Sequence, residues 1–197
     1  MLDHTRVCAT TPDGLRLVDC GDVAAGLIVW CGGFRASGLA ARSGLHTDEL
    51  GRLVVDRALR SLSHPQILAA GDCVATPPSV AGSGLRLCCQ AAMPAAAHAA
   101  DVVLAQLKGR EPRELHFGYI HQPISLGRRD GLIQFVDCAD RPKRSILTGR
   151  RAAIYKQLIT AEPIPSIRIE RLIPGSSRWP FKEPKAQRLE PGATVHG

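Results

Sequence analysis

Two continuous apolar runs stand out in the hydrophobic pattern of the chain, Leu27–Cys31 and Ile67–Ala70. Neither run contains a polar residue, so neither shows the alternation of a strand with one solvated face. Short uninterrupted runs of this kind are typical of strands buried on both faces, as in a parallel sheet. The pattern therefore predicts two buried strands, each of which needs neighbouring strands and helices.

The second run leads directly to a carboxylate, because Ile67–Ala70 is followed by Gly71 and Asp72. Glycine has no Cβ and lets the backbone pass close to a ligand, and open α/β sheets bind ligands at the carboxyl ends of their strands. A carboxylate accepts hydrogen bonds, which suits the hydroxyl groups of a sugar or ribityl chain. The same pair also fits a simple loop in which Asp72 caps the next element, and both interpretations stay open.

The first run also ends in glycine, at Gly32 and Gly33. A glycine pair permits tight passage past a ligand or another domain. It fits an ordinary exit from a strand into a loop equally well, so it is a candidate binding turn and no more.

A β-hairpin is predicted near the start of the chain, with its turn at Thr10–Gly14 between Arg6–Ala9 and Leu15–Val18. Two strands alone are marginally stable at best. Because Met1 stands almost directly before this hairpin, we expect a further element to precede it.

The segments between the two apolar runs predict short elements. Ala36–Leu45 predicts one or two helical turns, and Leu53–Asp56 predicts a short strand. The segment Ala75–Gly84, rich in proline, serine and glycine, is expected to be a loop.

The longest predicted helix begins near Cys88, runs to Leu107 and ends at Lys108 and Gly109, a typical C-terminal stop. Pro94 either occupies the first helical turn, where its missing N–H has no cost, or kinks a longer helix at a cost of about 3 kcal/mol. We favour the first alternative. In both cases the free N–H groups of the helix N-terminus favour a partner with negative charge.

From Glu111 onward the pattern predicts a second, small α+β unit. Gly127–Gly131 has the composition of a hairpin connection, Arg141–Arg144 that of a basic turn, and Arg150–Thr160 that of a helix. The last twenty or so residues have no periodicity and are expected to be disordered.

Charge restricts the possible partners. The 197 residues include 25 Lys and Arg against 18 Asp and Glu, a net charge of +7, which favours phosphate-bearing ligands, anionic membrane surfaces or nucleic acid. Aromatic residues make up 4% of the chain, too few for base-stacking platforms, so we expect no nucleic-acid partner.

Cysteine and histidine spacing indicates neither disulfides nor a metal. The seven cysteines are an odd number without a C-x-x-C pair and follow no secretory signal, so we interpret them as reduced thiols of a cytoplasmic protein. The histidines show no metal-ligand spacing. No apolar run approaches the roughly 18 residues that a membrane span needs.

A dinucleotide-binding fold begins with a strand, the sequence G-x-G-x-x-G and a helix. The nearest match, Gly82–Leu87, has leucine in place of the last glycine and follows a proline-rich loop. We interpret it as a surface turn.

The order of these motifs resembles that of the FAD-dependent pyridine-nucleotide-disulfide oxidoreductases, and within them the type II NADH dehydrogenase (NADH:quinone oxidoreductase) group. The hairpin is followed by LIVWCGGF at Leu27–Phe34, by Gly51–Asp56 and by ILAAGDC at Ile67–Cys73. The likeness covers about residues 5 to 160, and it is carried mainly by the spacing and order of the motifs.

The resemblance implies a set of cofactor-binding residues and leaves the catalytic residues unknown. Gly71 and Asp72 would bind the ribityl chain and phosphate region of FAD. The helix N-terminus would face the pyrimidine edge of the flavin through Cys89, Gln90 and Ala91. On the NAD(P)H side, the implied residues are Gly32 and Gly33.

The implied fold class is α/β, a partial FAD/NAD(P)-binding (Rossmann-like) fold followed by a small α+β C-terminal domain. Residues 1–45 would be a remnant of the NAD(P)H-binding domain, and residues 46–112 the C-terminal segment of the FAD-binding domain. Residues 113–175 would form the small domain, and residues 176–197 a disordered tail.

The implied function is to pass a hydride from NADH or NADPH to FAD and electrons on to an acceptor such as a quinone. In the family, two G-x-G-x-x-G motifs lie N-terminal to the matched region, so we expect a partner N-terminal half, on the same or a separate chain. Alone, this chain is expected to be incomplete and inactive. A homodimer and a peripheral position at a membrane surface both stay open, although no convincing amphipathic anchor supports the second. The alternative is a non-catalytic basic binding or regulatory module.

Overall fold

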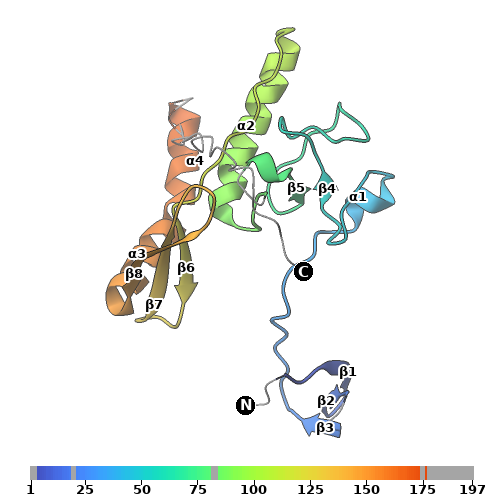
Figure 1. Ribbon diagram of the computed structural model, residues 1–197, viewed down its shortest axis with the longest axis vertical. Coiled ribbons are helices and arrows are strands. Elements are labelled where there is room, and N and C mark those ends of the chain that lie inside the picture. The colour runs from blue at the N-terminus through green and yellow to red at the C-terminus, as the bar shows by residue number, and fades with distance from the viewer. Residues whose placement is uncertain (1–3, 19–20, 81–83, 174–175, 177–197) are drawn as a thin grey trace, which may run out of the picture. The chain divides into compact units, whose positions relative to one another are not determined.

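The computed structural model describes residues 4–18, 21–80, 84–173 and 176 of a mixed α/β protein (Figure 1). Its contacts divide the chain into two compact units, Met1–Phe34 and Arg35–Gly197. Both units contain antiparallel strands, and the helices lie in the second.

The first unit is an antiparallel sheet of β1 (Val7–Thr11), β2 (Gly14–Leu17) and β3 (Gly21–Ala24), in that order. The predicted hairpin is confirmed by the pairing of β1 with β2, while β3 was not predicted. Gly14 is required at the turn because a Cβ there would collide with the Val23 carbonyl group.

The predicted buried strand at Leu27–Cys31 is wrong. Residues 27–37 form neither helix nor strand, and the side chains of Leu27 and Val29 are 81% and 74% exposed. A strand requires the edge of another strand, and within the described residues none pairs with this run. Gly32 and Gly33 therefore lie in an extended irregular segment.

The second unit begins with α1 (Leu39–Arg42) and a short parallel pair of β4 (Leu53–Val54) and β5 (Val74–Ala75). The predicted helical turn and the short strand at Leu53 are confirmed. The 3-10 turn η1 (Pro78–Val80) follows β5.

The predicted parallel strand at Ile67–Ala70 is wrong. Leu68 forms one antiparallel bridge, with Arg60, and the parallel strand is β5, which begins after Asp72. The reason is local, because a turn after β4 brings residues 59–61 back against this run and takes up its hydrogen bonds. The side chain that is buried in the core belongs to Val74.

The predicted long helix is α2 (Cys89–Leu107), and the position that we favoured for its proline is wrong. Pro94 is the sixth helical residue counted from Cys89, where it removes the N–H that would bond the Gln90 carbonyl. Its ring is almost completely buried. Burial of this apolar ring offsets part of the cost of the lost hydrogen bond.

The C-terminal part is an antiparallel sheet of β6 (His121–Ser125), β7 (Gly131–Val136) and β8 (Pro142–Thr148), packed against α3 (Gly149–Ala161). The predicted hairpin connection and the helix are confirmed. The predicted basic turn is wrong at its end, because Pro142 begins β8. The helix α4 (Pro163–Leu172) was not predicted, and the predicted tail lies, except for residue 176, outside the described residues.

One hydrophobic core joins the two parts of the second unit. It contains Leu53 and Leu59 near the parallel pair, Ala95 of α2, and Phe117 and Val136 beyond residue 112. The core thus crosses the position at which the sequence predicts a domain boundary. The four predicted domain ranges stay predictions.

Candidate functional site

Gly71 and Asp72 form the turn that leads into β5. Gly71 has φ +86°, a conformation that favours glycine, and its carbonyl accepts a hydrogen bond from the Val74 amide at 3.2 Å. Asp72 therefore precedes a strand instead of following one, which corrects its predicted position. Its side chain is exposed, and it makes no hydrogen bond or ion pair with any residue that the structure describes.

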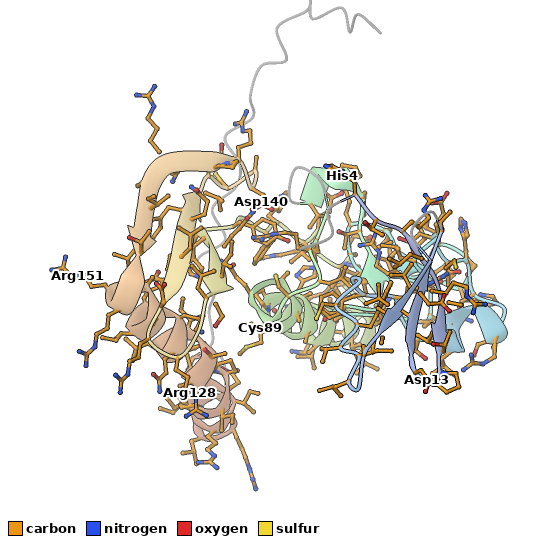
Figure 2. The ribbon with its side chains drawn as sticks, turned by 90° about the horizontal axis from the view of Figure 1, so that it is seen from below. His4, Asp13, Cys89, Arg128, Asp140 and Arg151 are labelled. Carbon is orange, nitrogen blue, oxygen red and sulfur yellow. The ribbon has the colours of Figure 1, made fainter. Side chains whose placement is uncertain are left out.

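The same turn packs on the start of α2. A Cβ placed on Gly71 would lie 3.9 Å from the Cβ of Ala92. Ala92 directly follows Cys89, Gln90 and Ala91 in the helix, so the Gly71 backbone lies close to the beginning of α2. Figure 2 shows Cys89 at this end of the helix. Whether these residues bind a cofactor stays a prediction.

The N-terminus of α2 has no capping side chain. Cys88 is the N-cap residue in an extended conformation, and its carbonyl accepts hydrogen bonds from the amides of Ala91 and Ala92 at 3.1 and 3.0 Å. The first turn contains no acidic residue. Its positive end is therefore not neutralised by a carboxylate of its own first turn.

The environment of Cys88 favours the protonated form of its thiol. Burial raises the pKa of the Cys88 thiol, and this effect outweighs the opposite effects of the Ala91 amide and of the nearby Arg86 guanidinium. A thiolate is the reactive form of cysteine, so Cys88 is unsuited to act as a nucleophile at neutral pH.

Arg86 connects the start of α2 to the C-terminal sheet. Its Nε lies 2.8 Å from Oδ2 of Asp140, its guanidinium stacks 4.1 Å from the centre of the Tyr119 ring, and its backbone amide donates to the Tyr119 hydroxyl at 2.6 Å. Despite this short distance, the Nε–H of Arg86 makes no hydrogen bond with Asp140. Nη2 is also buried without a hydrogen-bond partner among the described residues. Arg86 therefore has two buried nitrogens without a hydrogen-bond partner among the described residues, two positions before the N-cap of α2.

Sequence analysis missed the residues that Arg86 contacts. Asp140 has φ +66° and accepts a further hydrogen bond, from Nε2 of Gln122 at 3.1 Å. Figure 2 shows Asp140 in the turn between β7 and β8. Arg86 and Asp140 are far apart in sequence and share no motif, so no local signal could have paired them.

Gly32 and Gly33 belong to the first unit, and Gly71 and α2 belong to the second. Gly33 has φ +98°, which favours glycine. A Cβ on Gly32 would collide with the indole ring of Trp30. Local backbone conformation and packing thus account for both glycines without a ligand, and their predicted role on the NAD(P)H side stays a prediction.

The described residues contain no group of three or more histidine, cysteine, aspartate or glutamate side chains that could hold a metal ion. No helix in the described part of the chain is both long enough and apolar enough to cross a membrane. The site thus consists of the exposed Asp72 carboxylate and the N-terminus of α2, which has no capping side chain.

Residues 4–101 match the family described as pyridine nucleotide-disulphide oxidoreductase. NADH dehydrogenase-like proteins from two strains of Mycobacterium tuberculosis are 44% identical over 69 residues, which are 35% of this chain and 17% of theirs. A type II NADH:quinone oxidoreductase of Haemophilus influenzae is 36% identical over 73 residues, 36% of this chain and 16% of that protein. The matched region thus spans less than a fifth of the length of these relatives.

Two solved structures resemble the fold in part. A FAD-dependent pyridine nucleotide-disulphide oxidoreductase of Desulfovibrio vulgaris matches 64% of this chain and 32% of its own, with 23% identity and a TM-score of 0.44. An engineered water-forming NADPH oxidase bound to NADPH matches 67% of this chain and 29% of its own, with 21% identity and a TM-score of 0.43.

Proposed function

The chain carries a pyridine nucleotide-disulphide oxidoreductase domain over residues 4–101, and from this premise we propose that it forms one side of a flavin site. The complete enzyme would pass a hydride from NADH or NADPH to FAD and the electrons on to an acceptor such as a quinone. The relatives named NADH dehydrogenase-like protein and NADH:quinone oxidoreductase support this reaction class.

The contact between the Gly71–Asp72 turn and the first turn of α2 is the observation that carries the proposal. An exposed carboxylate without a protein partner can accept hydrogen bonds from ribityl hydroxyl groups. The open N-terminus of α2 can donate hydrogen bonds to the carbonyl oxygens of a flavin ring. Both groups therefore fit FAD.

In the proposed site each residue has one task. Asp72 orients the ribityl chain, and the backbone amides of Cys89 and Gln90 hold the edge of the flavin ring and favour negative charge there. Arg86 fixes the start of α2 through Asp140 and Tyr119. Bound FAD supplies the two-electron acceptor for the hydride.

The rest of the site would come from an N-terminal half with the dinucleotide-binding motifs, on the same or a separate chain. No strand followed by G-x-G-x-x-G occurs among the 197 residues. The parallel pair of β4 and β5 is consistent with a partial Rossmann-like fold that other strands complete. A homodimer is compatible with the same proposal.

A non-catalytic basic binding module is the second candidate. The net charge of +7 favours it, because a basic protein attracts phosphate-bearing ligands without any redox chemistry.

Titration of the 197-residue chain with FAD, followed by flavin fluorescence, separates the candidates. We expect weak or undetectable binding by the chain alone, because the phosphate-cradling loop is not in its sequence. Adding a chain that carries the two G-x-G-x-x-G motifs should give a yellow complex with tight binding. If the complex forms but stays free of flavin, the basic module replaces the flavin proposal.

A submicromolar dissociation constant for the chain alone would also contradict the account. Such affinity corresponds to about 8 kcal/mol or more. It would mean that this chain already contains the main phosphate contacts, contrary to the expected division of the site.

A further inference from the structure

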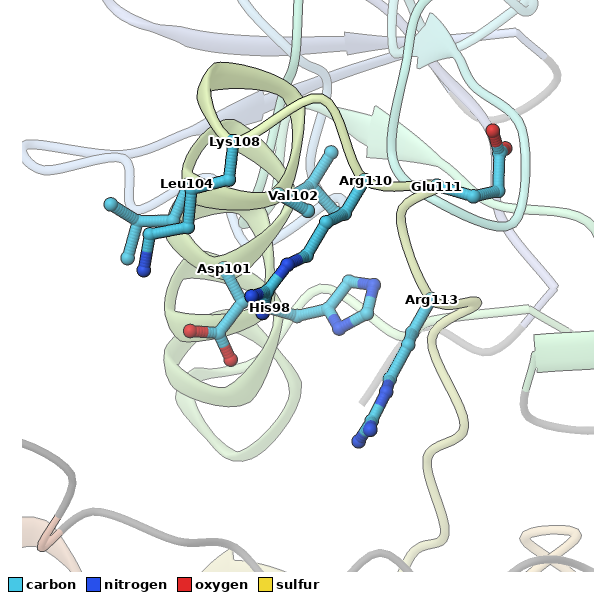
Figure 3. Close-up of a pocket in the computed structure, with 9 residues that line it drawn as sticks. His98, Asp101, Val102, Leu104, Lys108, Arg110, Glu111 and Arg113 are labelled. Atoms are coloured by element: carbon cyan, nitrogen blue, oxygen red, sulfur yellow. The ribbon is translucent and has the colours of Figure 1, made fainter.

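A pocket of about 360 Å³ lies beside the C-terminal half of α2, away from the proposed flavin site (Figure 3). His98 is nine residues beyond Cys89, which separates the pocket from the helix N-terminus by roughly 14 Å along the axis. Its volume lies in the range of small-molecule sites. Neither the flavin proposal nor the matched relatives' names account for it.

The turn after α2 builds one wall of this pocket. Gly109 has φ +63°, its amide donates to the Gln106 carbonyl at 3.0 Å, and the Arg110 amide donates to the Ala105 carbonyl at 2.9 Å. This pattern is a Schellman motif, which satisfies the last helical carbonyls and reverses the chain. Arg110 and Arg113 therefore return alongside the helix that has just ended.

The helix supplies the opposite wall. His98, Asp101, Val102 and Ala105 are spaced at i, i+3, i+4 and i+7, so they share one face of α2. Val102 is buried and Ala105 is half-buried, which gives the pocket an apolar floor.

Positive charge predominates at the rim. Lys108, Arg110 and Arg113 provide three cations against the two carboxylates of Asp101 and Glu111. In the described part of the chain, none of the three cations has a carboxylate oxygen within 4.0 Å. Figure 3 shows Arg110 extending across the helix above His98, and Glu111 directed away from the imidazole.

His98 lines the pocket and has a ring nitrogen without a partner in the described part of the chain. Its Nε2 is buried and has no hydrogen-bond partner among the described residues. Burial lowers the pKa of the imidazole, more than the Arg113 carbonyl and the Asp101 carboxylate raise it, so the ring is neutral at pH 7. Buried polar atoms are usually paired, and an unpaired one inside a pocket indicates a missing ligand group.

We propose that this pocket binds a small phosphate ester that also carries hydroxyl groups. The guanidinium groups of Arg110 and Arg113 match the geometry of phosphate oxygens, and Lys108 adds a third positive charge. A rotation of the imidazole ring brings Nε2 of His98 to a ligand hydroxyl, and the carbon skeleton of the ligand lies on Val102 and Ala105. A free phosphate ion would satisfy the cations alone and leave His98 without a partner.

Calorimetric titration of the full chain with glucose 6-phosphate, inorganic phosphate and glucose at one ionic strength tests the proposal. We expect glucose 6-phosphate to bind about tenfold or more tightly than inorganic phosphate, since each additional ligand group found in its place contributes binding free energy. Glucose alone should give no measurable binding.

The double variant Arg110→Gln with Arg113→Gln should weaken binding of glucose 6-phosphate about tenfold or more. The matched control is Arg128→Gln with Arg129→Gln, in the exposed connection between β6 and β7, where Figure 2 marks Arg128. This control removes the same charge and should change affinity less than about twofold. Lys108→Gln, a single exposed substitution at the C-cap of α2, provides a second variant if the double variant unfolds.

His98→Leu tests the hydroxyl contact separately. It should remove the preference for glucose 6-phosphate over inorganic phosphate while leaving phosphate affinity unchanged. An equal loss of affinity for glucose 6-phosphate in the two arginine double variants would overturn the proposal, because it would show that the net charge of the protein attracts the ligand. Equal affinity for the ester and the free ion, or no binding of either, would also overturn it. Each of these results is independent of whether the chain takes part in a flavin site.

Discussion

Leu27–Cys31 and Ile67–Ala70 have the same pattern in sequence and different environments in the structure, because the first run is largely exposed and Leu68, Ala69 and Ala70 of the second are partly buried. Both are apolar runs that end in glycine. The first is irregular, with Trp30 69% exposed, whereas Ala69 and Ala70 pack against the hydrophobic core. The second run has β4, β5 and α2 near it in sequence, whereas the described part of the first run's unit contains one antiparallel sheet and no helix.

This difference shows that an apolar run is buried only where other elements of the fold cover it. The run itself does not determine whether those elements are present. Leu27, Val29, Trp30 and Phe34 leave apolar side chains exposed within a short segment of the first unit. Patches of this kind mark surfaces that another chain or domain covers. This agrees with the proposal that an N-terminal half completes the protein.

Truncation of a buried leucine, Leu53, and of an exposed leucine, Leu27, should give the largest difference in the free energy of unfolding. Leu53 of β4 is almost fully buried, so Leu53→Ala should lower the free energy of unfolding by about 2–5 kcal/mol. Leu27→Ala removes the same atoms from an exposed side chain and should change it by less than about 0.5 kcal/mol. Urea denaturation followed by circular dichroism measures both, and similar losses in the two variants would show that the first run is buried in solution.

Substitution of two aspartates near the second run, Asp56 and Asp72, should give a smaller difference in the free energy of unfolding. Asp56 accepts hydrogen bonds from the Ala58 and Arg60 amides, both at 2.9 Å, and from Nε of Arg60 at 2.7 Å. Asp56→Ala should therefore cost about 1.5–3 kcal/mol of stability. Asp72 has no such partner among the described residues, and Asp72→Ala should cost less than about 0.5 kcal/mol.

Thermal denaturation of the two variants under identical buffer conditions checks this second difference. If Asp72→Ala is as destabilising as Asp56→Ala, then Asp72 has a structural partner. It would not be a carboxylate held available for a ligand.

Local signals in the sequence predicted a large part of the fold. The predictions of the turn at Thr10–Gly14 and of the helix end at Lys108 and Gly109 were correct, because these features are determined by residues that are neighbours in sequence. The strand positions around Asp72 were wrong because they depend on the turn at Asp56, which brings residues 59–61 back. That turn places the buried Leu59 at φ +65°, a conformation that its sequence does not suggest.

The candidate site shows the same limit. The sequence indicated Gly71, Asp72 and the N-terminus of α2, and the structure brings the Gly71 backbone close to Ala92 of that helix. It could not indicate the pair of Arg86 and Asp140, because only the folded chain brings a residue before α2 against the turn between β7 and β8.

Flavin retention in the protein completed by its dinucleotide-binding half tests the central claim most directly. Asp56 is unsuitable as a control because it holds a turn, whereas Asp13, which is exposed in the first unit, is suitable. Loss of a charge-assisted hydrogen bond of about 1.5–3 kcal/mol predicts that Asp72→Ala raises the FAD dissociation constant roughly 10- to 150-fold. Asp13→Ala should leave it unchanged. Equal flavin occupancy in the two variants, measured by the ratio of flavin to protein absorbance after gel filtration, would contradict the assignment of Asp72 to the flavin site.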